Sequence, residues 1–461
     1  METGRNVMHY ALGDNQDYEH EWSKAVLEYL ENGYSSEDSK SEVEVGNTTY
    51  KILKREKVTA FYDADGNTLF DVTNDRLKEE YEAMESLDEI TDKLQTGVLF
   101  DGENEKLIKK ILFEEQARMY NKSKKKQKCM CPNCHNESII KSHTIPRKMS
   151  LDIIADNKKI ITPFFIERYP ISNQFIGVKE MGIGETSTFP GFCKAHEMIF
   201  QSYEKKGTIS KEEDVIKQLY RNIAYNYFLF KERIELSEHI EDRYRKVRNQ
   251  AAYNYLKKLE PTNALKKVIL EGNDKYIEKL IYHRTELNDF CTKLEKYRMS
   301  LWKIINGNDA DITVNSVVID MVFPVCICGC TEIVLDNQEY LCSVDVVSNK
   351  NNTLITIGVC GDISSELSNA VDTRLNHPLA ILNFIEAVMI YGTDNWYLNP
   401  KVWNALSNQR KERLLSEMQN LGKSIFSELP YSIFDDIRKY IIENISLEKQ
   451  NVERELSKMR I

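Results

Sequence analysis

Two short cysteine and histidine pairs in the chain have the spacing of metal ligands. Cys131 and Cys134 lie in the segment CPNC, and Cys193 and His196 lie in FCKAH. A tight turn at this spacing directs two ligand atoms to one side, and two such pairs complete the tetrahedral coordination of a structural Zn²⁺. We therefore predict a zinc site formed by these four residues. Cys129 is an alternative to Cys131, because the sequence CMC places two thiols close together.

The first pair is also compatible with other uses of cysteine. CPNCH, which ends at His135, matches the motif for attachment of c-type haem, a modification of exported chains. No apolar signal region is present at the N-terminus, so we expect no export. A redox CxxC of the thioredoxin type follows a strand, whereas the basic segment 121–128 precedes this one. Buried cysteines beside a surface histidine are the remaining alternative.

A further histidine follows the first pair closely. His143 lies in IIKSHTIPRKM, residues 139–149, after two apolar residues and before an Ile-Pro-Arg segment. The order CPNC, then IIKSHTIP, then GFCKAHEMIFQSYE resembles that of the HNH, or ββα-metal, endonucleases, which are built on a treble-clef zinc frame. The resemblance covers residues 129–204, under a fifth of the chain.

The resemblance implies metal-dependent hydrolysis of nucleic-acid phosphodiester bonds. It makes His143 the general base, since a neutral imidazole can activate water. It makes Glu197 a contact of a catalytic Mg²⁺ or Mn²⁺ ion, separate from the structural zinc. We expect Lys141, Arg147 and Lys148 to bind the phosphates of the nucleic acid, with DNA as the preferred partner. Restriction or antiviral defence is the biological role that the resemblance suggests.

Three positions depart from the pattern of these nucleases. Ser142 stands where an acidic residue commonly precedes the histidine, and ETSTFPGF, residues 185–192, contains no clear central Asn. Phe200 and Glu204 lie near the place of the third histidine. The alternatives are therefore a zinc module that binds nucleic acid or a protein without catalysis, and a regulatory subunit of a larger complex. His143 itself would then be a structural histidine, or a zinc ligand in place of His196.

Charge is unevenly distributed along the chain, whose net charge is −10. Residues 1–104 hold 25 acidic and 10 basic residues, a balance of −15, whereas residues 105–170 hold 7 acidic and 15 basic residues, a balance of +8. Local basic surfaces attract phosphate backbones even in an acidic protein. We expect the acidic front either to mask the basic segment or to bind a protein partner, as the C-terminal domain also could. The alternative is that both faces are simply solvated.

Hydrophobic periodicity divides the chain into parts and predicts a multidomain α+β protein. Before the first boundary, the patterns predict helices over 18–32, 75–95 and 104–120, a loop over 34–46, and a strand hairpin over 49–72 that turns at Gly66. The parts are an acidic α+β domain (1–120), a basic linker (121–128), the zinc module (129–204), a helical region (205–310) and a C-terminal α+β domain (311–461).

The remaining composition bears on location and on the other cysteines. No run of about 18 apolar residues is present, so we predict no membrane span and expect a cytoplasmic protein with reduced cysteines. Cys326, Cys328 and Cys330, in VCICGC, would form a second metal site if Cys342 or Cys360 joined them. Alternate residues of a strand point to one face, so core packing is the competing interpretation, and the one we favour.

Overall fold

The computed structural model describes a mixed helix and sheet protein. It describes residues 40–45, 48–55, 57–75 and 125–460, except 167–174, 260–271, 274, 336 and 421, together with scattered residues between 29 and 121. The helices predicted over 18–32, 75–95 and 104–120 lie largely outside the described residues, and the linker 121–128 lies partly outside them.

Contacts divide the chain into two compact units, and two long helices contribute to both. The smaller unit comprises Met1–Ile111 and Ile240–Tyr282, and the larger comprises Leu112–His239 and His283–Ile461. The predicted helical region contains α7 (Glu212–Leu259) and α8 (Lys275–Ile305). Among the described helices, none combines the length and the apolar character needed to cross a membrane.

The smaller unit contains a four-stranded antiparallel sheet in the order β1-β2-β3-β4. The predicted hairpin is confirmed, because Gly66 turns the chain with a φ of +87° between β3 and β4. Asp63 fixes this turn by accepting hydrogen bonds from the backbone and the side chain of Asn67. A strand, β1, lies within the segment predicted as a loop. The strands are β1 (Lys40–Val45), β2 (Thr48–Lys54), β3 (Val58–Tyr62) and β4 (Thr68–Thr73).

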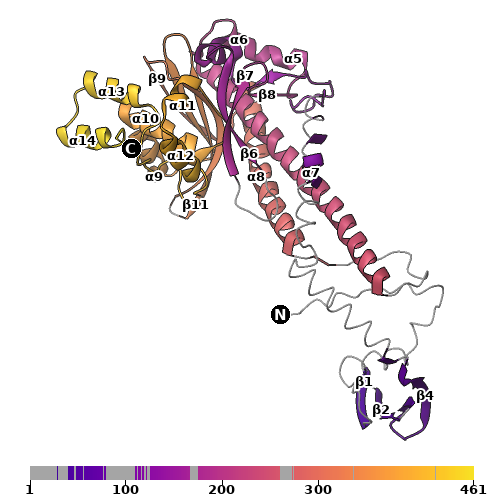
Figure 1. Cartoon of the computed structure of the whole chain (residues 1–461). Coiled ribbons are helices and arrows are strands. Elements are labelled where there is room, and N and C mark those ends of the chain that lie inside the picture. The colour runs from indigo at the N-terminus through magenta and orange to yellow at the C-terminus, as the bar shows by residue number, and fades with distance from the viewer. Residues whose placement is uncertain are drawn as a thin grey trace. The chain divides into compact units, whose positions relative to one another are not determined.

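The larger unit is built on a seven-stranded antiparallel sheet in the order β7-β6-β13-β10-β11-β12-β9 (Figure 1). The short strand β13 pairs with β10 on one side and with β6 on the other, so strands from the predicted zinc module and from the C-terminal domain share one sheet. The strands are β6 (Lys159–Ile166), β7 (Phe175–Gly182), β9 (Ile312–Ile319), β10 (Val325–Leu335), β11 (Gln338–Ser348), β12 (Thr353–Cys360) and β13 (Trp396–Leu398).

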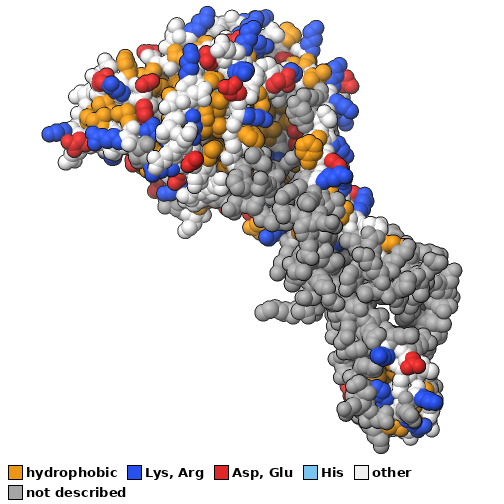
Figure 2. Space-filling view, in the orientation of Figure 1, with side chains coloured by type: hydrophobic (Ala, Val, Ile, Leu, Met, Phe, Trp, Pro, Cys, Tyr) orange, Lys and Arg blue, Asp and Glu red, His pale blue; other side chains and the backbone are white. Residues whose placement is uncertain are grey.

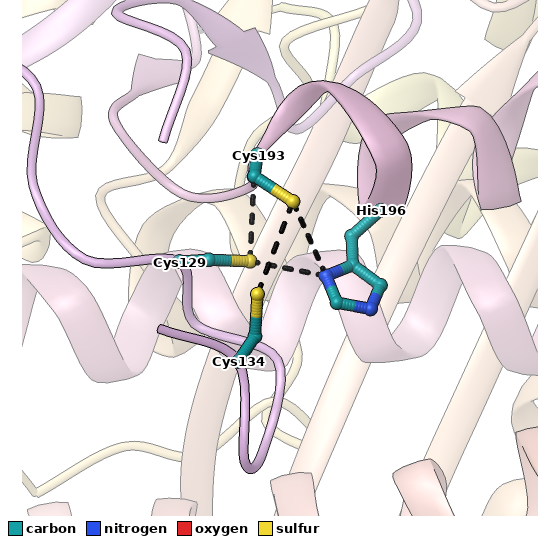
Figure 3. A group of neighbouring side chains, drawn as sticks. All are labelled: Cys129, Cys134, Cys193 and His196. Carbon is teal, nitrogen blue, oxygen red and sulfur yellow. Dashed lines mark hydrogen bonds between the residues drawn. The ribbon is translucent and has the colours of Figure 1, made fainter. Parts of the chain in front are cut away.

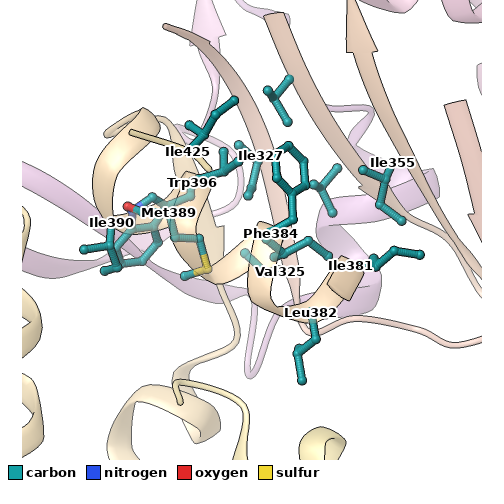
Figure 4. Packing of buried hydrophobic residues seen from close by; sticks show 14 of the residues in the cluster. Val325, Ile327, Ile355, Ile381, Leu382, Phe384, Met389, Ile390, Trp396 and Ile425 are labelled. Atoms are coloured by element: carbon teal, nitrogen blue, oxygen red, sulfur yellow. The ribbon is translucent and has the colours of Figure 1, made fainter. Parts of the chain in front are cut away.

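Each face of this sheet has its own core. Val325 and Ile327 of β10 pack with the C-terminal helices, as the close view in Figure 4 shows. Cys326, Cys328 and Cys330 point to the opposite face and pack with α7 and α8. Burial raises the pKa of all three thiols above the usual range, which keeps them neutral. These cysteines are therefore core residues, and within the described part of the chain they belong to no metal-binding group.

The C-terminal helices cover one face and are joined by a buried ion cluster. Arg438, with no exposed side chain, binds the carboxylates of Glu386 and Glu455, which are also buried. Lys458, 3.3 Å from an oxygen of Glu455 and almost fully buried, supplies the second positive charge, so two cations balance two carboxylates. Buried charges must be paired in this way to be tolerated, so the cluster fixes α10, α13 and α14 against one another. The helices are α9 (Ser365–Leu375), α10 (Pro378–Ala387), α11 (Pro400–Ala405), α12 (Asn408–Glu417), α13 (Asp435–Asn444) and α14 (Lys449–Ser457).

The segment of the predicted zinc module continues directly into the larger unit. Strands β5 (Ser142–His143) and β8 (Thr188–Phe189) form a two-stranded sheet, in which His143 is opposite Thr188. Residues 194–204 are helical through α5 (Lys194–Glu197), a 3₁₀ turn at Met198–Phe200, and α6 (Gln201–Glu204). The predicted boundaries at 204 and 311 therefore fall within one compact unit. Strand pairing across more than two hundred residues leaves no local trace in the sequence.

Candidate metal centre

Four side chains converge between the first cysteine loop and the start of α5 (Figure 3). They are Cys129, Cys134, Cys193 and His196, and their ligand atoms all lie within 4.8 Å of one another. Nδ1 of His196 is 3.3 Å from Sγ of Cys129 and 3.4 Å from Sγ of Cys193. The Sγ atoms of Cys134 and Cys193 are 4.0 Å apart. The cluster therefore offers three thiols and one imidazole to a single point.

The size of the cluster suits a tetrahedral metal ion. Zinc bonds of about 2.3 Å to sulfur and about 2.0 Å to nitrogen place tetrahedral sulfur ligands about 3.8 Å apart, and sulfur and nitrogen about 3.6 Å apart. The three distances given above are within a few tenths of an ångström of these values, and all the ligand atoms lie within 4.8 Å of one another. Thiolate and imidazole are the donors that structural zinc sites use. The prediction of a Cys/His cluster able to bind a metal such as zinc is confirmed.

The first cysteine loop is shaped by a tight turn. The backbone N–H of Cys134 donates to the carbonyl of Cys131, 3.1 Å away, and Asn133 has a φ of +61°. Pro132 precedes Asn133, and proline followed by a residue of positive φ is the sequence pattern of a type II turn. The turn carries Cys134 to the cluster. Cys129 reaches it from the strand-like segment before the turn, where its N–H donates to the carbonyl of Asn136.

Cys193, the cysteine of the second pair, lies at the start of a helix. Cys193 immediately precedes α5, and one turn later His196 directs its ring to the same point. The backbone N–H of Cys193 donates to Sγ of Cys129, 3.3 Å away, which joins the two halves of the cluster. Gly191 is required just before this point, because a Cβ atom there would lie 2.3 Å from the ring of Phe189.

Cys131 differs from the prediction, because the structure brings Cys129 into the cluster instead. Sγ of Cys131 is buried and accepts a hydrogen bond from the Tyr220 hydroxyl, 3.7 Å away on α7. A hydrogen bond from the Cys131 thiol lowers the pKa of Cys129 to about 4, and the same bond, together with burial, raises the pKa of Cys131. Cys129 is therefore the member of this pair that lies with the other three ligands, and Cys131 is its buried neighbour, held by Tyr220.

This arrangement separates the roles of the two neighbouring cysteines. We expect a Cys131→Ala variant to keep zinc, with an affinity lowered about 10- to 100-fold, because it loses a hydrogen bond to a ligand and keeps the ligand itself. A Cys129→Ala variant loses the ligand and should lose the zinc. Competition with a zinc chelator, followed by elemental analysis, measures both affinities. Equal loss of zinc in the two variants would show that Cys131 is itself a zinc ligand.

His143 lies at the end of β5, next to Ser142, whose hydroxyl donates to Glu197, the neighbour of His196 in the sequence. Its Nδ1 is 3.1 Å from the carbonyl oxygen of Thr186, so Nδ1 carries the proton and donates, and Nε2 keeps its lone pair. Burial, and then the charge of Arg221, lower the pKa of His143 to about 4. The ring is therefore neutral at pH 7. His143 is not one of the four residues of the metal cluster, whereas His196 is.

Glu197 follows the ligand His196 and is fully engaged by other side chains. Its Oε2 accepts a hydrogen bond from Ser142 Oγ at 2.7 Å, and its Oε1 pairs with Arg221 Nη2 at 2.5 Å. The other terminal nitrogen of Arg221 pairs with Glu204 Oε1, also at 2.5 Å. Two carboxylates and one guanidinium thus form a compact ion cluster next to the strand that carries His143.

The basic residues predicted to bind phosphates are all exposed. Lys141 forms an ion pair with Glu185, and Arg147 lies 3.6 Å from Asp152. Lys148 is exposed on the turn of π-helix that spans Arg147–Leu151. Where side chains are coloured on the face shown in Figure 2, basic and acidic groups are mixed over the larger unit. That face offers no broad area of one charge.

Sequence reasoning identifies Cys129 as an alternative ligand and misses Arg221. Arg221 lies on α7, 24 residues beyond Glu197. The sequence holds no local signal for Arg221, because helix geometry places it on the side of α7 away from the apolar positions Leu219, Tyr220 and Ile223. Its partners Phe200, Glu197 and Glu204 come from other elements.

Neither a protein family model, nor a curated protein, nor a solved structure matches this chain. The HNH resemblance therefore rests on the motifs around Cys134, His143 and Cys193 alone, and the treble-clef frame stays a prediction.

Proposed function

We propose that the chain hydrolyses phosphodiester bonds in nucleic acid, with His143 as the general base. The observation that carries this proposal is the state of the His143 ring. Nδ1 is held by the Thr186 carbonyl, the lowered pKa keeps the ring neutral, and Nε2 can accept a proton. A positioned neutral imidazole is the commonest group for taking a proton from an attacking water. The treble-clef, ββα-metal character of the surrounding module is part of the same proposal.

The proposed reaction is a single displacement at phosphorus. Nε2 of His143 takes a proton from water while the water oxygen attacks, the bond from phosphorus to the leaving sugar oxygen breaks, and that oxygen takes a proton from solvent. Burial and the charge of Arg221 lower the pKa of His143, and the negative charge of Glu204 opposes this in part, which favours the imidazolium that results. Lys141, Arg147 and Lys148 are the exposed residues that we propose bind the phosphates, as charge-assisted hydrogen bonds to phosphate oxygens require.

Zinc would have a structural role in this site. Cys129, Cys134, Cys193 and His196 are the residues that would hold it, and a bound Zn²⁺ joins a loop to a helix. By fixing the first cysteine loop against α5, these ligands hold Glu197 opposite Ser142 and the adjacent His143. The chain's own residues then carry out the chemistry.

The Mg²⁺ or Mn²⁺ ion implied by the resemblance does not fit Glu197 as the structure has it. Both oxygens of that carboxylate already have partners, one of them the positively charged Arg221. We therefore assign no step of the reaction to an ion held by Glu197. A divalent ion that assists the reaction would be bound elsewhere, for example by the phosphate of the substrate.

Cleavage assays on the full chain test the proposal. Supercoiled plasmid, single-stranded DNA and RNA are incubated with the zinc-loaded protein, with Mg²⁺, with Mn²⁺ and without either. We expect nicked plasmid or shortened strands with at least one substrate, and DNA to be cut in preference to RNA. Substrates that all remain intact under every condition contradict the proposal.

A zinc module that binds nucleic acid without cutting it is the second candidate. The observation that favours it is the pairing of Glu197 with Ser142 and Arg221, which leaves that carboxylate without an evident catalytic task. This candidate predicts retention of DNA on filters with an affinity that falls steeply with salt, and no cleavage. A protein partner bound through the acidic N-terminal part or the C-terminal domain, and a role in restriction or antiviral defence, stay predictions of the sequence.

A further inference from the structure

Arg221 is the most deeply buried charge beside His143. Its side chain is 1% exposed, while those of Glu197 and Glu204 are 19% and 31% exposed. The guanidinium lies over the ring of Phe200, 4.5 Å from the centroid, so an aromatic face covers it. A guanidinium is always charged and presents its donors in a rigid fork, which matches two carboxylates at once.

The position of this guanidinium corresponds to that of a bridging cation. It contacts one oxygen of Glu197 and one oxygen of Glu204, and so neutralises both carboxylates from a single point. A divalent ion held by the same oxygens would need to lie within about 2.0–2.6 Å of them. The divalent ion would then lie close to the buried, positively charged guanidinium of Arg221. Repulsion in such a poorly solvated place is strong.

We infer that Arg221 takes the place of a divalent cation in this site, holding Glu197 and Glu204 as a permanent ion cluster that takes up no Mg²⁺ or Mn²⁺. The argument rests on the contacts and burial of Arg221. Any divalent ion that the chain uses must therefore be bound by residues other than these two glutamates.

The cluster also positions the strand that carries His143. Arg221 pairs with Oε1 of Glu197, and Oε2 of the same carboxylate accepts a hydrogen bond from the Ser142 hydroxyl. Ser142 is fully buried. Ser142 and His143 are consecutive residues of β5. Arg221 is thus a positioning residue that acts on His143 through Glu197 and Ser142.

Binding of Mn²⁺ to the full, zinc-loaded chain tests the inference. Equilibrium dialysis with Mn²⁺ is carried out after elemental analysis has shown that the zinc site is filled, so that the ion cannot enter the cysteine cluster. We expect the wild type to bind the same amount of Mn²⁺ as the Glu197→Gln and Glu204→Gln variants. A stoichiometric Mn²⁺ in the wild type that is lost in Glu197→Gln or Glu204→Gln overturns the inference. This comparison does not require any variant of Arg221.

Removing the guanidinium provides the converse test. In Arg221→Gln the two carboxylates lose their cation, and we expect the variant to bind about one Mn²⁺ per chain and to melt at a higher temperature when Mn²⁺ is present. Arg233→Gln is the matched control, because Arg233 lies on the same helix and pairs with Asp394 at the partly exposed surface. A folded Arg221→Gln variant that gains no Mn²⁺ beyond this control also overturns the inference.

These measurements concern the same site as the proposed function and do not depend on it. Mn²⁺ binding is measured without substrate, so the inference stands or falls whether or not the chain cleaves nucleic acid.

Discussion

Replacing Cys193 with serine is expected to abolish zinc binding and to unfold the segment 129–204. Cys193 is buried, its Sγ lies near both Cys134 and His196, and its N–H donates to Sγ of Cys129. A serine hydroxyl is a poor zinc ligand, and structural zinc contributes about 10–16 kcal/mol of apparent binding energy in small domains. A loss on that scale equals or exceeds the whole stability of a typical domain, about 5–15 kcal/mol.

The effect should extend beyond the cysteine loop. β6 and β7 lie in the seven-stranded sheet, and Phe192 and Phe200 pack in the same core as α7. We therefore expect increased hydrogen exchange in β5, β8 and α5 and a lower melting temperature for the whole larger unit. Elemental analysis measures the zinc content, exchange mass spectrometry the hydrogen exchange, and thermal denaturation the melting temperature.

A second buried cysteine provides the control for this experiment. Cys291 on α8 is 7% exposed and lies outside the cluster, so Cys291→Ser makes the same chemical change without touching a ligand. This control should keep its zinc and lose only the modest stability that accompanies a buried polar atom. Full zinc content in Cys193→Ser, together with wild-type melting, would contradict the assignment of the site.

Much of the metal cluster could be predicted, because ligand spacing is a local property of the sequence. Cys134, Cys193 and His196 follow from the two pairs, since a tight turn and a helix start each impose their own geometry. The fourth ligand could not be decided in the same way. Cys129 and Cys131 are two residues apart, and either could supply the fourth ligand as far as the sequence shows. The choice depends on Tyr220, 89 residues beyond Cys131, which holds the Cys131 sulfur in the core.

The fold shows the same division between local and distant causes. The turn at Gly66 and the alternating cysteines of β10 could be predicted from neighbouring residues. β1 was missed because KSEVEV is polar, and an edge strand with one apolar stripe resembles a loop in composition. The pairing of β13 with both β6 and β10 depends on residues far apart in the chain, and it joins two parts that the sequence analysis had separated.

The candidate catalytic residues depend even more on distant contacts. His143 was predicted from its motif, but the state of its ring is set by Thr186 and by Arg221, which lie 43 and 78 residues further along the chain. Glu197 was predicted to bind a divalent ion because it follows a ligand. In the structure its carboxylate instead accepts a hydrogen bond from Ser142 and pairs with Arg221, and both partners come from other elements.

Replacing His143 with alanine is expected to reduce cleavage by about 10²- to 10⁴-fold, the range usual for loss of a general base. The zinc content should be unchanged, because His143 is not among the ligands. His135→Ala is the matched control, since His135 is exposed, lies close to the same cluster and is also outside the ligand set. Wild-type activity in His143→Ala would rule His143 out as the base. Loss of zinc in that variant would instead make it a ligand.

The pH dependence of cleavage gives a sharper test of the same residue. Only the neutral ring can accept a proton, and burial together with Arg221 lowers the pKa of His143 to about 4. Wild-type activity should therefore stay level from neutral pH down to about 5 and fall only as the pH approaches 4, whereas a base with the usual pKa of about 6.5 would already lose activity below pH 7. Zinc content measured at each pH separates this titration from protonation of the metal ligands. Arg221→Gln removes a nearby positive charge, so the fall in its residual activity should move to higher pH. An unchanged profile in that variant would mean that Arg221 does not act on the His143 ring.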